Sequence, residues 1–487
     1  MRPTRHVAID LGAESGRVVV GTLEGGRLAI TEVHRFGNGP VKMLGTLRWD
    51  LVRLWEEILC GLRKVGGEVE SVSVDSWGVD YVLVRGREPM VGVAFNYRDP
   101  RADGPYQRLL ARIGETAIYD ATGVQFMSIN SLYQLVADFE RDPQWVESAD
   151  GFLMIADWFH WLLSGRRVVE ETNASTTQLY DPRRRAWSED VIAAAGLPRT
   201  LFADAVVQPG TRLGPMGVDV AAETGLRGVE VVAGCTHDTA AAVAAVPATG
   251  DDWAYLSSGT WSLLGVELTK PLLSEAARRA NFTNEIGFGG TIRFLTNLVG
   301  LWIVQECRRE WTRAGMAWTY DELTEQAAEA PALRALIRPD DPRFVGPDDM
   351  PGKVQAFCRE TGQAVPATLG AIIRCVLESL ALLYRQRLDE VESLTNRTVR
   401  VLHIVGGGCR NRLLNQFAAD ATRRTVIAGP VEATAIGNVL VQAIALGHLD
   451  SLASLRRVVR ESFEVERFEP AASERWDEAR ARFSALL

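Results

Sequence analysis

The chain has 487 residues, of which 47% are hydrophobic and 24% are charged, and its formal net charge is −9. This length exceeds what one compact core usually holds, so two or three domains are expected. The negative net charge gives no indication of a surface rich in Lys and Arg, and it argues against a nucleic-acid-binding protein. No apolar run approaches the ~20 residues that span a bilayer, and the first one is too short for a signal peptide. We therefore expect a cytoplasmic protein without a membrane partner.

The six cysteines are scattered along the chain without a C-x-x-C pair, and the six histidines are also dispersed. This spacing matches none of the common zinc motifs and fits thiols that stay reduced. Metal-thiolate chemistry is therefore not expected.

The first predicted elements are strands. Residues 6–23 are typical of two apolar strands joined by a glycine-containing turn. Asp50 can cap a helix predicted over 51–64, where apolar residues recur at helical spacing. Residues 71–84 predict a strand, a tight connection and a second strand.

Residues 231–246, VVAGCTHDTAAAVAAV, predict the end of a strand, a turn and the start of a helix. Thr236 could cap this helix. Asp238 allows two interpretations: it is an acid in the first helical turn, favoured there by the helix dipole, or it is a catalytic carboxylate with room for a substrate beside its small neighbours. The segment alone does not decide between them.

A linker is predicted at 247–252, and residues 253–267 then repeat the opening pattern of strand, small-residue turn and strand. The two turns, Asp10 to Arg17 and Ser257 to Thr260, stand at matching places in the two halves. Together they could offer backbone N–H groups to a polyphosphate from both sides, although each alone could be an ordinary hairpin.

The second half contains a long amphipathic helix at about 369–392, a loop predicted at 339–352, and a strand that runs through three glycines into a helix at 401–416. The glycines are a weak nucleotide-binding signal, because Asn411 stands where a dinucleotide fold needs its third glycine. Residues 346–353 do not form a P-loop, since the spacing is one residue too long and Val354 follows the lysine. Hydride transfer and P-loop phosphoryl transfer are both disfavoured.

These features predict an α/β protein with the two-domain actin- and hexokinase-like (ribonuclease H-like) fold and a catalytic cleft between the domains. The sequence resembles the FGGY carbohydrate kinases nearly end to end, which implies an N-terminal domain over 1–246 and a C-terminal domain over 247–487. The matching blocks are DLGAESGR (10–17), WGVD (77–80), NYRD (96–99), SLYQL (131–135), TNASTTQL (172–179), THDTAAAV (236–243), YLSSGTWSLLG (255–265), NLVGLW (297–302), LHIVGGGCRNRLLNQ (402–416) and VIAGPVEATAIGN (426–438).

The resemblance implies ATP and Mg²⁺ as cofactors, with Asp10 acting near the metal ion, which needs hard oxygen ligands. Because a further negative charge beside a triphosphate would weaken its binding, we expect the Glu14 side chain to point away from the nucleotide. The residues that the resemblance places on ATP are Ala13, Glu14, Ser15, Gly16, Arg17, Thr260, Gln305 and Gly407.

For the sugar, the resemblance implies contacts from Gly78, His237, Asp238, Thr239 and Asn297. Asp238 would be the base that removes a proton from the sugar hydroxyl, and an ordinary carboxyl pKa of about 4 would suffice because the transition state is loose. His237 either binds the sugar or only orients the turn. Trp77 either covers the methyl end of a deoxy-sugar or belongs to the core.

The blocks IVGGGC and SSGTWS resemble the branch of the family that acts on deoxy-sugars. This resemblance implies phosphorylation of L-rhamnulose at O1, a step of L-rhamnose catabolism. The alternatives are another ketose, L-fuculose first and then a pentulose, or a sugar-sensing homologue without activity. The oligomeric state is not indicated by the sequence.

Overall fold

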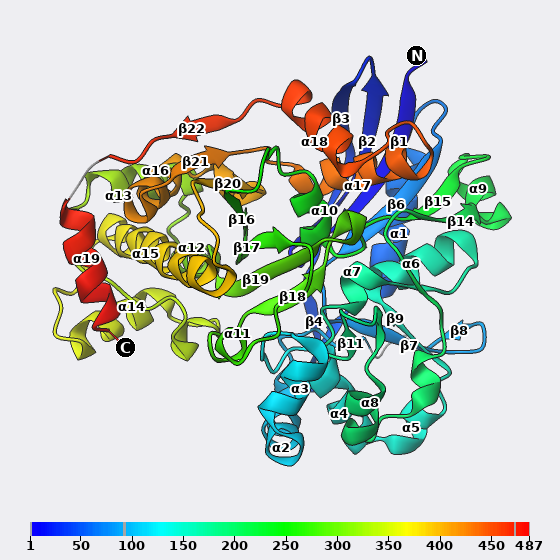
Figure 1. The fold of residues 1–487 in the computed structure, drawn as a ribbon, viewed down its shortest axis with the longest axis horizontal. Helices are drawn as coiled ribbons and strands as arrows, with labels where there is room; N and C mark the ends of the chain where they lie inside the picture. Colours follow the sequence, from blue (N-terminus) through cyan, green and yellow to red (C-terminus); the bar gives the residue numbers. More distant parts are fainter. Residues whose placement is uncertain (1, 91–93, 472–473, 487) are drawn as a thin grey trace. The chain divides into compact units, whose positions relative to one another are not determined.

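The computed structural model describes residues 2–90, 94–471 and 474–486 (Figure 1). The chain forms two compact units, each assembled from several segments. Unit 1 comprises Met1–Pro247, Glu267–Phe294 and Ala433–Ser462, and unit 2 comprises Ala248–Val266, Leu295–Glu432 and Phe463–Leu487. The predicted domains, 1–246 and 247–487, follow the two halves of the sequence and remain a prediction. The compact units divide the chain differently, because unit 1 also includes two segments from the second half.

Unit 1 is built on a six-stranded sheet in the order β14-β15-β6-β1-β2-β3. Strands β1, β6 and β15 run parallel, whereas β2, β3 and β14 join their neighbours antiparallel. The last six residues of β1 are buried in an unbroken run, which is typical of a strand covered on both faces. The strands are β1 (Thr4–Leu11), β2 (Ser15–Glu24), β3 (Arg27–Gly37), β6 (Ser71–Ser76), β14 (Thr211–Pro215) and β15 (Glu230–Ala233).

Several helices of unit 1 pack against this sheet. Helix α1 (Leu51–Arg63) contacts β2 and β3, and α6 (Ile155–Ser164) contacts β6 and β15. Helix α17 (Ala433–Ala445) contacts β1, β2 and β6, and α10 (Asp238–Ala244) packs on α17. The predicted cap of α1 is confirmed, because the Asp50 carboxylate accepts a hydrogen bond from the Arg53 N–H at 3.1 Å.

The strands predicted within 71–84 are present, but they enter different sheets. Strand β6 lies in the six-stranded sheet, while β7 (Tyr81–Arg85) pairs with β9 (Gly151–Met154) in a three-stranded one. The remaining elements of unit 1 are β4 (Pro40–Met43), β5 (Thr46–Trp49), β8 (Glu88–Pro89), α2 (Asp103–Ile113), α3 (Glu115–Thr122), α4 (Ser131–Arg141), α5 (Pro143–Glu147), β10 (Val169–Glu170), α7 (Glu171–Ala174), β11 (Tyr180–Asp181), β12 (Ala186–Trp187), α8 (Glu189–Ala195), β13 (Val206–Val207), α9 (Val218–Thr224), α11 (Glu275–Arg279), β18 (Thr283–Ile286) and α18 (Leu452–Ser462).

The second large sheet has seven strands in the order β18-β19-β17-β16-β20-β21-β22. Strand β16 is antiparallel to β17 and parallel to β20, and β20 is parallel to β21. The strands not yet bounded are β16 (Trp253–Ser258), β17 (Trp261–Leu268), β19 (Ile292–Val299), β20 (Val401–Val405), β21 (Thr425–Ala428) and β22 (Glu466–Phe468).

The long helix predicted at about 369–392 is confirmed as α15 (Leu369–Thr395), which packs against α13 and α16. The loop predicted at 339–352 was wrong at its end, because α14 begins at Met350, where the Asp349 carboxylate accepts from the Gly352 N–H at 3.1 Å. The other helices of unit 2 are α12 (Trp302–Arg313), α13 (Tyr320–Glu329), α14 (Met350–Glu360), α16 (Arg412–Thr422) and α19 (Glu474–Ser484).

The two units repeat one strand order. In unit 1 the series is β3-β2-β1-β6-β15, and the second sheet contains the matching series β19-β17-β16-β20-β21. In both series an antiparallel hairpin is followed by parallel neighbours. The predicted α/β architecture with a repeated hairpin is confirmed.

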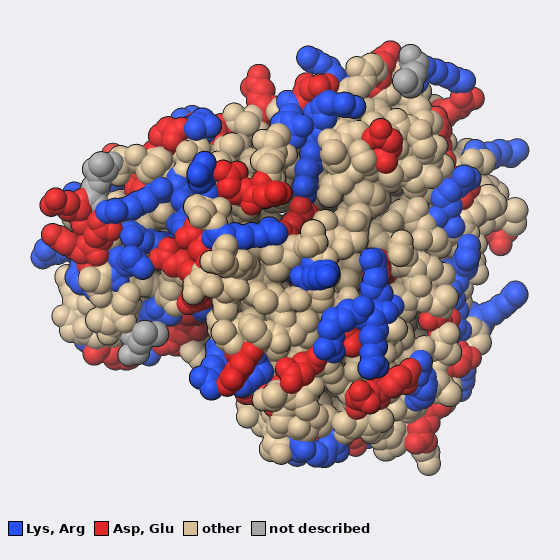
Figure 2. All heavy atoms as spheres, viewed as in Figure 1, with Lys and Arg blue, Asp and Glu red and all other residues tan. Residues whose placement is uncertain are grey.

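The surface carries both signs of charge. On the face drawn in Figure 2, Lys and Arg side chains are interspersed with Asp and Glu. None of the helices in the described part of the chain combines the length and the apolar character that a membrane crossing requires.

Candidate active site

The first turn joins β1 to β2 and carries a partly buried ion pair. Asp10, at the end of β1, lies opposite Arg17 in the strand register, and the Arg17 Nε and Nη2 atoms donate to Asp10 Oδ2 at 2.9 and 2.6 Å. Between them, the Gly12 N–H donates to the Ser15 carbonyl at 2.9 Å. Ala13 is half-buried and Glu14 is exposed. The sequence predicts separate roles for Asp10 and Arg17 and gives no sign of their contact.

Gly16 is explained by packing within unit 1. A Cβ at this position would lie 2.3 Å from the Phe36 ring, so a larger residue would push the hairpin away from β3.

A second acid lies beside Asp10. Strand β6 places Asp75 next to Asp10, and Asp75 is fully buried. The Asn438 amide of α17 donates to Asp75 Oδ2 at 2.5 Å. Burial, and then the nearby Asp10, raise the pKa of Asp75 well above its ordinary value. Sequence reasoning missed this residue, for which an acid inside a fully buried strand was the available signal.

The turn between β15 and α10 carries the second group of predicted residues. His237 occupies the N-cap position of α10, so the capping role predicted for Thr236 was wrong. The Thr236 hydroxyl instead donates to Glu170 Oε2 at 2.8 Å. Glu170 is fully buried, and burial raises its pKa to about 7. The turn is thus anchored to a buried acid that the sequence analysis did not single out.

Asp238 is the first residue of α10 and leaves one carboxylate oxygen available. Its Oδ1 accepts from the Thr239 N–H at 2.5 Å and from the Thr239 hydroxyl at 3.1 Å. Oδ2 has no hydrogen-bond partner among the described residues, and the side chain is 30% exposed. Burial is the largest influence on this carboxyl group; with the nearby Asp10, it raises the pKa against the lowering effect of His237 and Thr239. The expectation of an ordinary pKa near 4 is therefore corrected upward.

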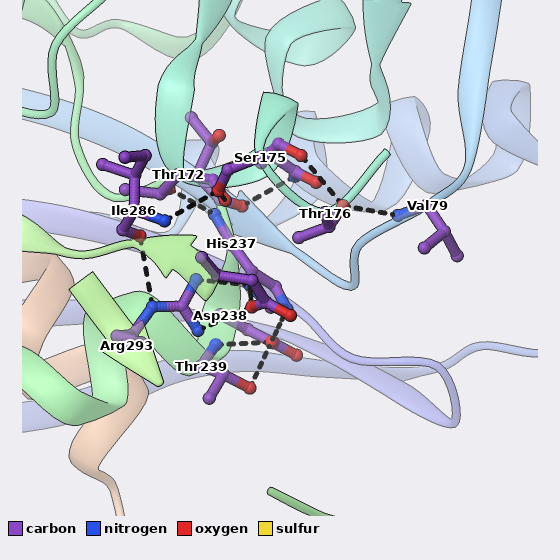
Figure 3. Close-up of polar contacts among 12 residues, drawn as sticks. Val79, Thr172, Ser175, Thr176, His237, Asp238, Thr239, Ile286 and Arg293 are labelled. Carbon is purple, nitrogen blue, oxygen red and sulfur yellow. Dashed lines mark hydrogen bonds and ion pairs between the residues drawn. The ribbon is translucent and has the colours of Figure 1, made fainter. Parts of the chain in front are cut away.

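His237 is held by two buried charged residues from neighbouring strands. Arg293 Nη2 lies 3.0 Å from His237 Nδ1 (Figure 3). Glu285 Oε2 lies 3.4 Å from the same nitrogen. His237 Nε2 lies 3.5 Å from Asp238 Oδ1. Neither partner was predicted from the sequence, although Arg293, a charged residue in the largely apolar strand β19, was a usable signal.

Gly78 follows β6 in a tight segment of backbone. A Cβ on Gly78 would lie 3.0 Å from Thr176 Oγ1, and the next residue, Val79, has a φ of +67°. Trp77 is buried, donates to Asp80 Oδ2 at 3.0 Å and packs on Trp49 with ring centroids 4.1 Å apart. These contacts place Trp77 in the core.

The second turn, between β16 and β17, is attached to the start of α12. The Thr260 carbonyl accepts from the Gly300 and Trp302 N–H groups, each at 3.2 Å. One turn into α12 lies Gln305, whose Oε1 is buried without a hydrogen-bond partner among the described residues. Asn297 is partly exposed on β19.

The three glycines after β20 differ in what surrounds them. A Cβ on Gly408 would lie 2.1 Å from Ser258 Oγ, and Gly406 has a φ of +84°. A Cβ on Gly407 would meet no described atom within 4 Å. Packing within the protein therefore accounts for Gly406 and Gly408 but not for Gly407.

The predicted site residues fall into two sets. Unit 1 holds Asp10, Ala13, Glu14, Ser15, Gly16, Arg17, Gly78, His237, Asp238 and Thr239, and unit 2 holds Asn297, Thr260, Gln305 and Gly407. In unit 1 the first turn and the α10 turn are close enough for Asp10 to influence the pKa of Asp238. In unit 2 Thr260 and Gln305 are linked through α12.

Comparison with known proteins gives the family. Residues 6–245 match the N-terminal domain of the FGGY family of carbohydrate kinases, and residues 254–446 match its C-terminal domain. A rhamnulokinase of Bacteroides thetaiotaomicron is 40% identical over 98% of both chains. A rhamnulokinase of Pectobacterium carotovorum is 42% identical over 99% of this chain and 96% of its own.

Solved structures give the same fold at lower identity. A gluconate kinase from Lactobacillus acidophilus has a TM-score of 0.78 at 15% identity, covering 99% of this chain and 96% of that one. A xylulose kinase from Rhodospirillum rubrum has a TM-score of 0.77 at 20% identity, covering 99% and 98%. The predicted actin-like kinase fold is therefore confirmed. Together with the two domain matches, these comparisons establish that the chain belongs to the FGGY family of carbohydrate kinases and is a sugar kinase.

Proposed function

We propose that this kinase transfers the γ-phosphoryl group of ATP to O1 of L-rhamnulose, giving L-rhamnulose 1-phosphate and ADP. One observation carries the choice of sugar: relatives named rhamnulokinase are 38–42% identical to this chain over 94–99% of its length. The similarity extends through both sets of site residues and is not confined to one domain.

Asp238 is the proposed general base. Its unbonded Oδ2 can accept the proton of the attacking hydroxyl, while Oδ1 is fixed by Thr239. Burial and the nearby Asp10 raise the pKa of Asp238, which makes its carboxylate a stronger base than that of an ordinary aspartate. The loose transition state requires little proton removal before attack, so orientation and charge neutralisation supply most of the rate.

The turns are the proposed phosphate-binding elements. Ala13 to Arg17 offer backbone N–H groups and a guanidinium in unit 1, and Thr260 offers a hydroxyl in unit 2. The open space at Gly407 and the unpartnered Oε1 of Gln305 support an adenosine contact in unit 2. The exposed position of Glu14 supports the expectation that its charge points away from the phosphates.

The residues of unit 1 are compatible with a Mg²⁺ ion that takes most of its ligands from water and from the phosphates of ATP. The described residues contain no group of three or more His, Cys, Asp or Glu side chains arranged to hold a metal ion. Arg17 Nε and Nη2 both donate to Asp10 Oδ2, and the Asp10 carboxylate is the hard oxygen donor that this turn offers. Mg²⁺ commonly keeps several waters and takes one or two carboxylates together with phosphate oxygens. The ion would neutralise phosphate charge during transfer.

Gly78, His237, Thr239 and Asn297 are the proposed sugar contacts beside Asp238. The small Gly78 lets the backbone approach a ligand, and the polar groups can pair with hydroxyls in fixed orientations. These residue types suit several ketoses, so L-fuculose and the pentuloses are the alternative substrates.

A sugar panel tests the proposal. Mg²⁺- and ATP-dependent ADP release is measured with L-rhamnulose, L-fuculose, D-ribulose, D-xylulose and glycerol, and phosphorus NMR locates the phosphate on the product. The proposal predicts the highest kcat/KM for L-rhamnulose and a phosphate coupled to the C1 protons. A higher kcat/KM for another ketose would show that L-rhamnulose is not the preferred substrate, while the proposed phosphoryl transfer from ATP would stand.

A further inference from the structure

We propose that Arg293 is a positioning residue that, balanced by Glu285, holds His237 as a neutral imidazole with its proton on Nε2. His237 is then a hydrogen-bond donor facing the reacting groups, and Asp238 alone serves as the base. This inference deepens the proposed function and rests on the role of Asp238 given there. The state of the ring itself can be measured without substrate.

The contact between Arg293 and His237 fixes the tautomer. Arg293 Nη2 lies 3.0 Å from His237 Nδ1, and a guanidinium has only N–H donors and stays charged in proteins. Nδ1 must therefore accept, and the single proton of a neutral ring is left on Nε2. A proton on Nδ1 as well would bring two N–H groups against each other.

Arg293 is itself fixed in position. Its side chain is fully buried, and its Nε donates to the Ile286 carbonyl at 3.2 Å. Its Nη1 lies 3.0 Å from Glu285 Oε2, so the positive charge is balanced inside unit 1. Burial works to raise the pKa of Glu285, and the Arg293 guanidinium is the largest influence that holds this pKa below its ordinary value. The pair is thus ionised, and the guanidinium cannot turn away without leaving a buried carboxylate unpaired.

One competing state uses the same atoms. Glu285 Oε2 is 3.4 Å from His237 Nδ1, so a doubly protonated ring could donate to it. The shorter contact to Arg293 and the commitment of Glu285 to that guanidinium favour the neutral ring. The difference between the two states is the protonation of Nδ1.

The groups around His237 explain why a cation is needed to keep its imidazole neutral. The elements packed around His237 carry mostly acidic groups, which favour a charged imidazole. Asp238 on α10 and Glu285 on β18 lie against the ring, and Asp10 on β1 is close to Asp238. Asp75 on β6, Glu170 on β10 and Glu171 on α7 act on the neighbouring Cys235, but the raised pKa values of Asp75 and Glu170 reduce the negative charge of those two groups. Arg17 is paired with Asp10 and Arg185 with Glu171, whereas Arg293 is the cation that touches the ring.

A neutral donor suits the chemistry of Asp238. His237 Nε2 is 3.5 Å from Asp238 Oδ1, so its proton faces the carboxylate and any hydroxyl bound next to it. An imidazolium at this distance would stabilise the carboxylate and lower its basicity. By keeping the ring neutral, Arg293 preserves Asp238 as an acceptor.

Nitrogen NMR of the whole protein labelled with ¹⁵N-histidine measures the state of the ring directly. The six histidines give few signals, and a His237→Gln variant identifies those of His237. The proposal predicts one protonated and one unprotonated nitrogen at neutral pH, with the proton on Nε2. Two protonated nitrogens, or a proton on Nδ1, would overturn it.

Three variants separate the roles of the partners. Arg293→Met should let Glu285 draw a proton onto Nδ1, giving two protonated nitrogens. Glu285→Gln should leave the neutral ring unchanged, because Arg293 still occupies Nδ1. The double variant Arg293→Met/Glu285→Gln should return a neutral ring. An Arg293→Met protein whose ring signals match the wild type would overturn the proposal.

Kinetics distinguish positioning from structural support. For Arg293→Met we expect kcat at neutral pH to fall by up to about a hundredfold. Because the charged ring must lose its proton, the rate should recover as pH rises and the acid limb should move to higher pH. Arg338→Met is the control, since Arg338 is also a buried arginine, paired with Asp340 at 2.9 Å in unit 2. A merely structural Arg293 would lower the melting temperature, as this control should, without moving the pH profile.

The ring measurement also separates this inference from the proposed function. If the ring is neutral and responds as described but L-rhamnulose is a poor substrate, the positioning role stands and only the sugar is wrong. If L-rhamnulose is turned over but the ring is charged in the wild type, the positioning role fails and the proposed function stands.

Discussion

The β1–β2 turn of unit 1 and the β16–β17 turn of unit 2 occupy the same place in their strand series but carry different side chains. The first contains the Asp10–Arg17 ion pair with Asp75 beside it. The second contains hydroxyls and glycine, and its carbonyls bind the start of α12. One strand order therefore supports a charged hairpin in one unit and a neutral one in the other.

The strand ends beyond the hairpins continue this contrast. In unit 1, β15 leads into the His237–Asp238 turn, where ionisable groups cluster around Arg293. In unit 2, β20 leads into three glycines, one of which has open space above it. Under the proposed function, unit 1 would supply charged groups for the chemistry, and unit 2 would supply backbone and small polar groups for the nucleotide.

The two hairpins should respond unequally to removal of their polar groups. Asp10→Asn should lower kcat about a hundredfold, because it removes an anionic oxygen near the phosphates and the proposed metal ion. Thr260→Val should cost about tenfold, the worth of one hydrogen bond to a charged group. Magnesium titrations of kcat for both variants check this order, and Asp10→Asn should also need more Mg²⁺. An equal or larger effect at Thr260 would contradict the contrast between the hairpins.

Substitution of Gly437 tests how closely α17 packs against α10, the helix that begins at Asp238. A Cβ on Gly437 in α17 would lie 1.9 Å from the Ala241 carbonyl oxygen, so Gly437→Ala must push α17 away from α10. We expect the free energy of unfolding to fall by about 2 kcal/mol despite the better helix propensity of alanine. Urea unfolding measures the loss. Unchanged stability would mean that the two helices are not in close contact.

Gly407 should behave in the opposite way. Because the space around a Cβ there holds no described atom, Gly407→Ala should leave the urea midpoint unchanged. If that space receives adenosine, the KM for ATP should rise about tenfold, as expected for a steric cost near 1.4 kcal/mol. Steady-state kinetics with ATP varied checks this, and an unchanged KM would remove Gly407 from the nucleotide site.

Much of the secondary structure could be predicted from the sequence, because the local hydrophobic patterns and capping residues agree with the packing in the structure. The 369–392 helix and the two hairpins have strong periodicity, and Asp50 caps α1 as its position indicates. The sequence of residues 71–84 does not show that β6 and β7 belong to different sheets, because the sheet that a strand joins depends on partner strands far along the chain. The helix start at Met350 was hidden within a run rich in Pro and Asp.

The candidate site was predictable only for residues inside recognisable motifs. Asp10, His237 and Asp238 stand in such blocks, but Glu285 and Arg293 do not, and they reach His237 from strands that are distant in sequence. The cap of α10 was misassigned because the buried Glu170 accepts the Thr236 hydroxyl. The pKa of Asp238 could not be read from sequence, since it depends on burial and on Asp10.

The pH dependence of turnover in the wild type and in Asp238→Asn tests the central claim most directly. The account predicts that wild-type kcat with L-rhamnulose falls as pH drops through the pKa of Asp238, at a higher pH than for an ordinary aspartate. Asp238→Asn should lower kcat by about 10² to 10⁴ and remove that acid limb. A variant that keeps wild-type turnover and the same acid limb would contradict the account and place the base elsewhere.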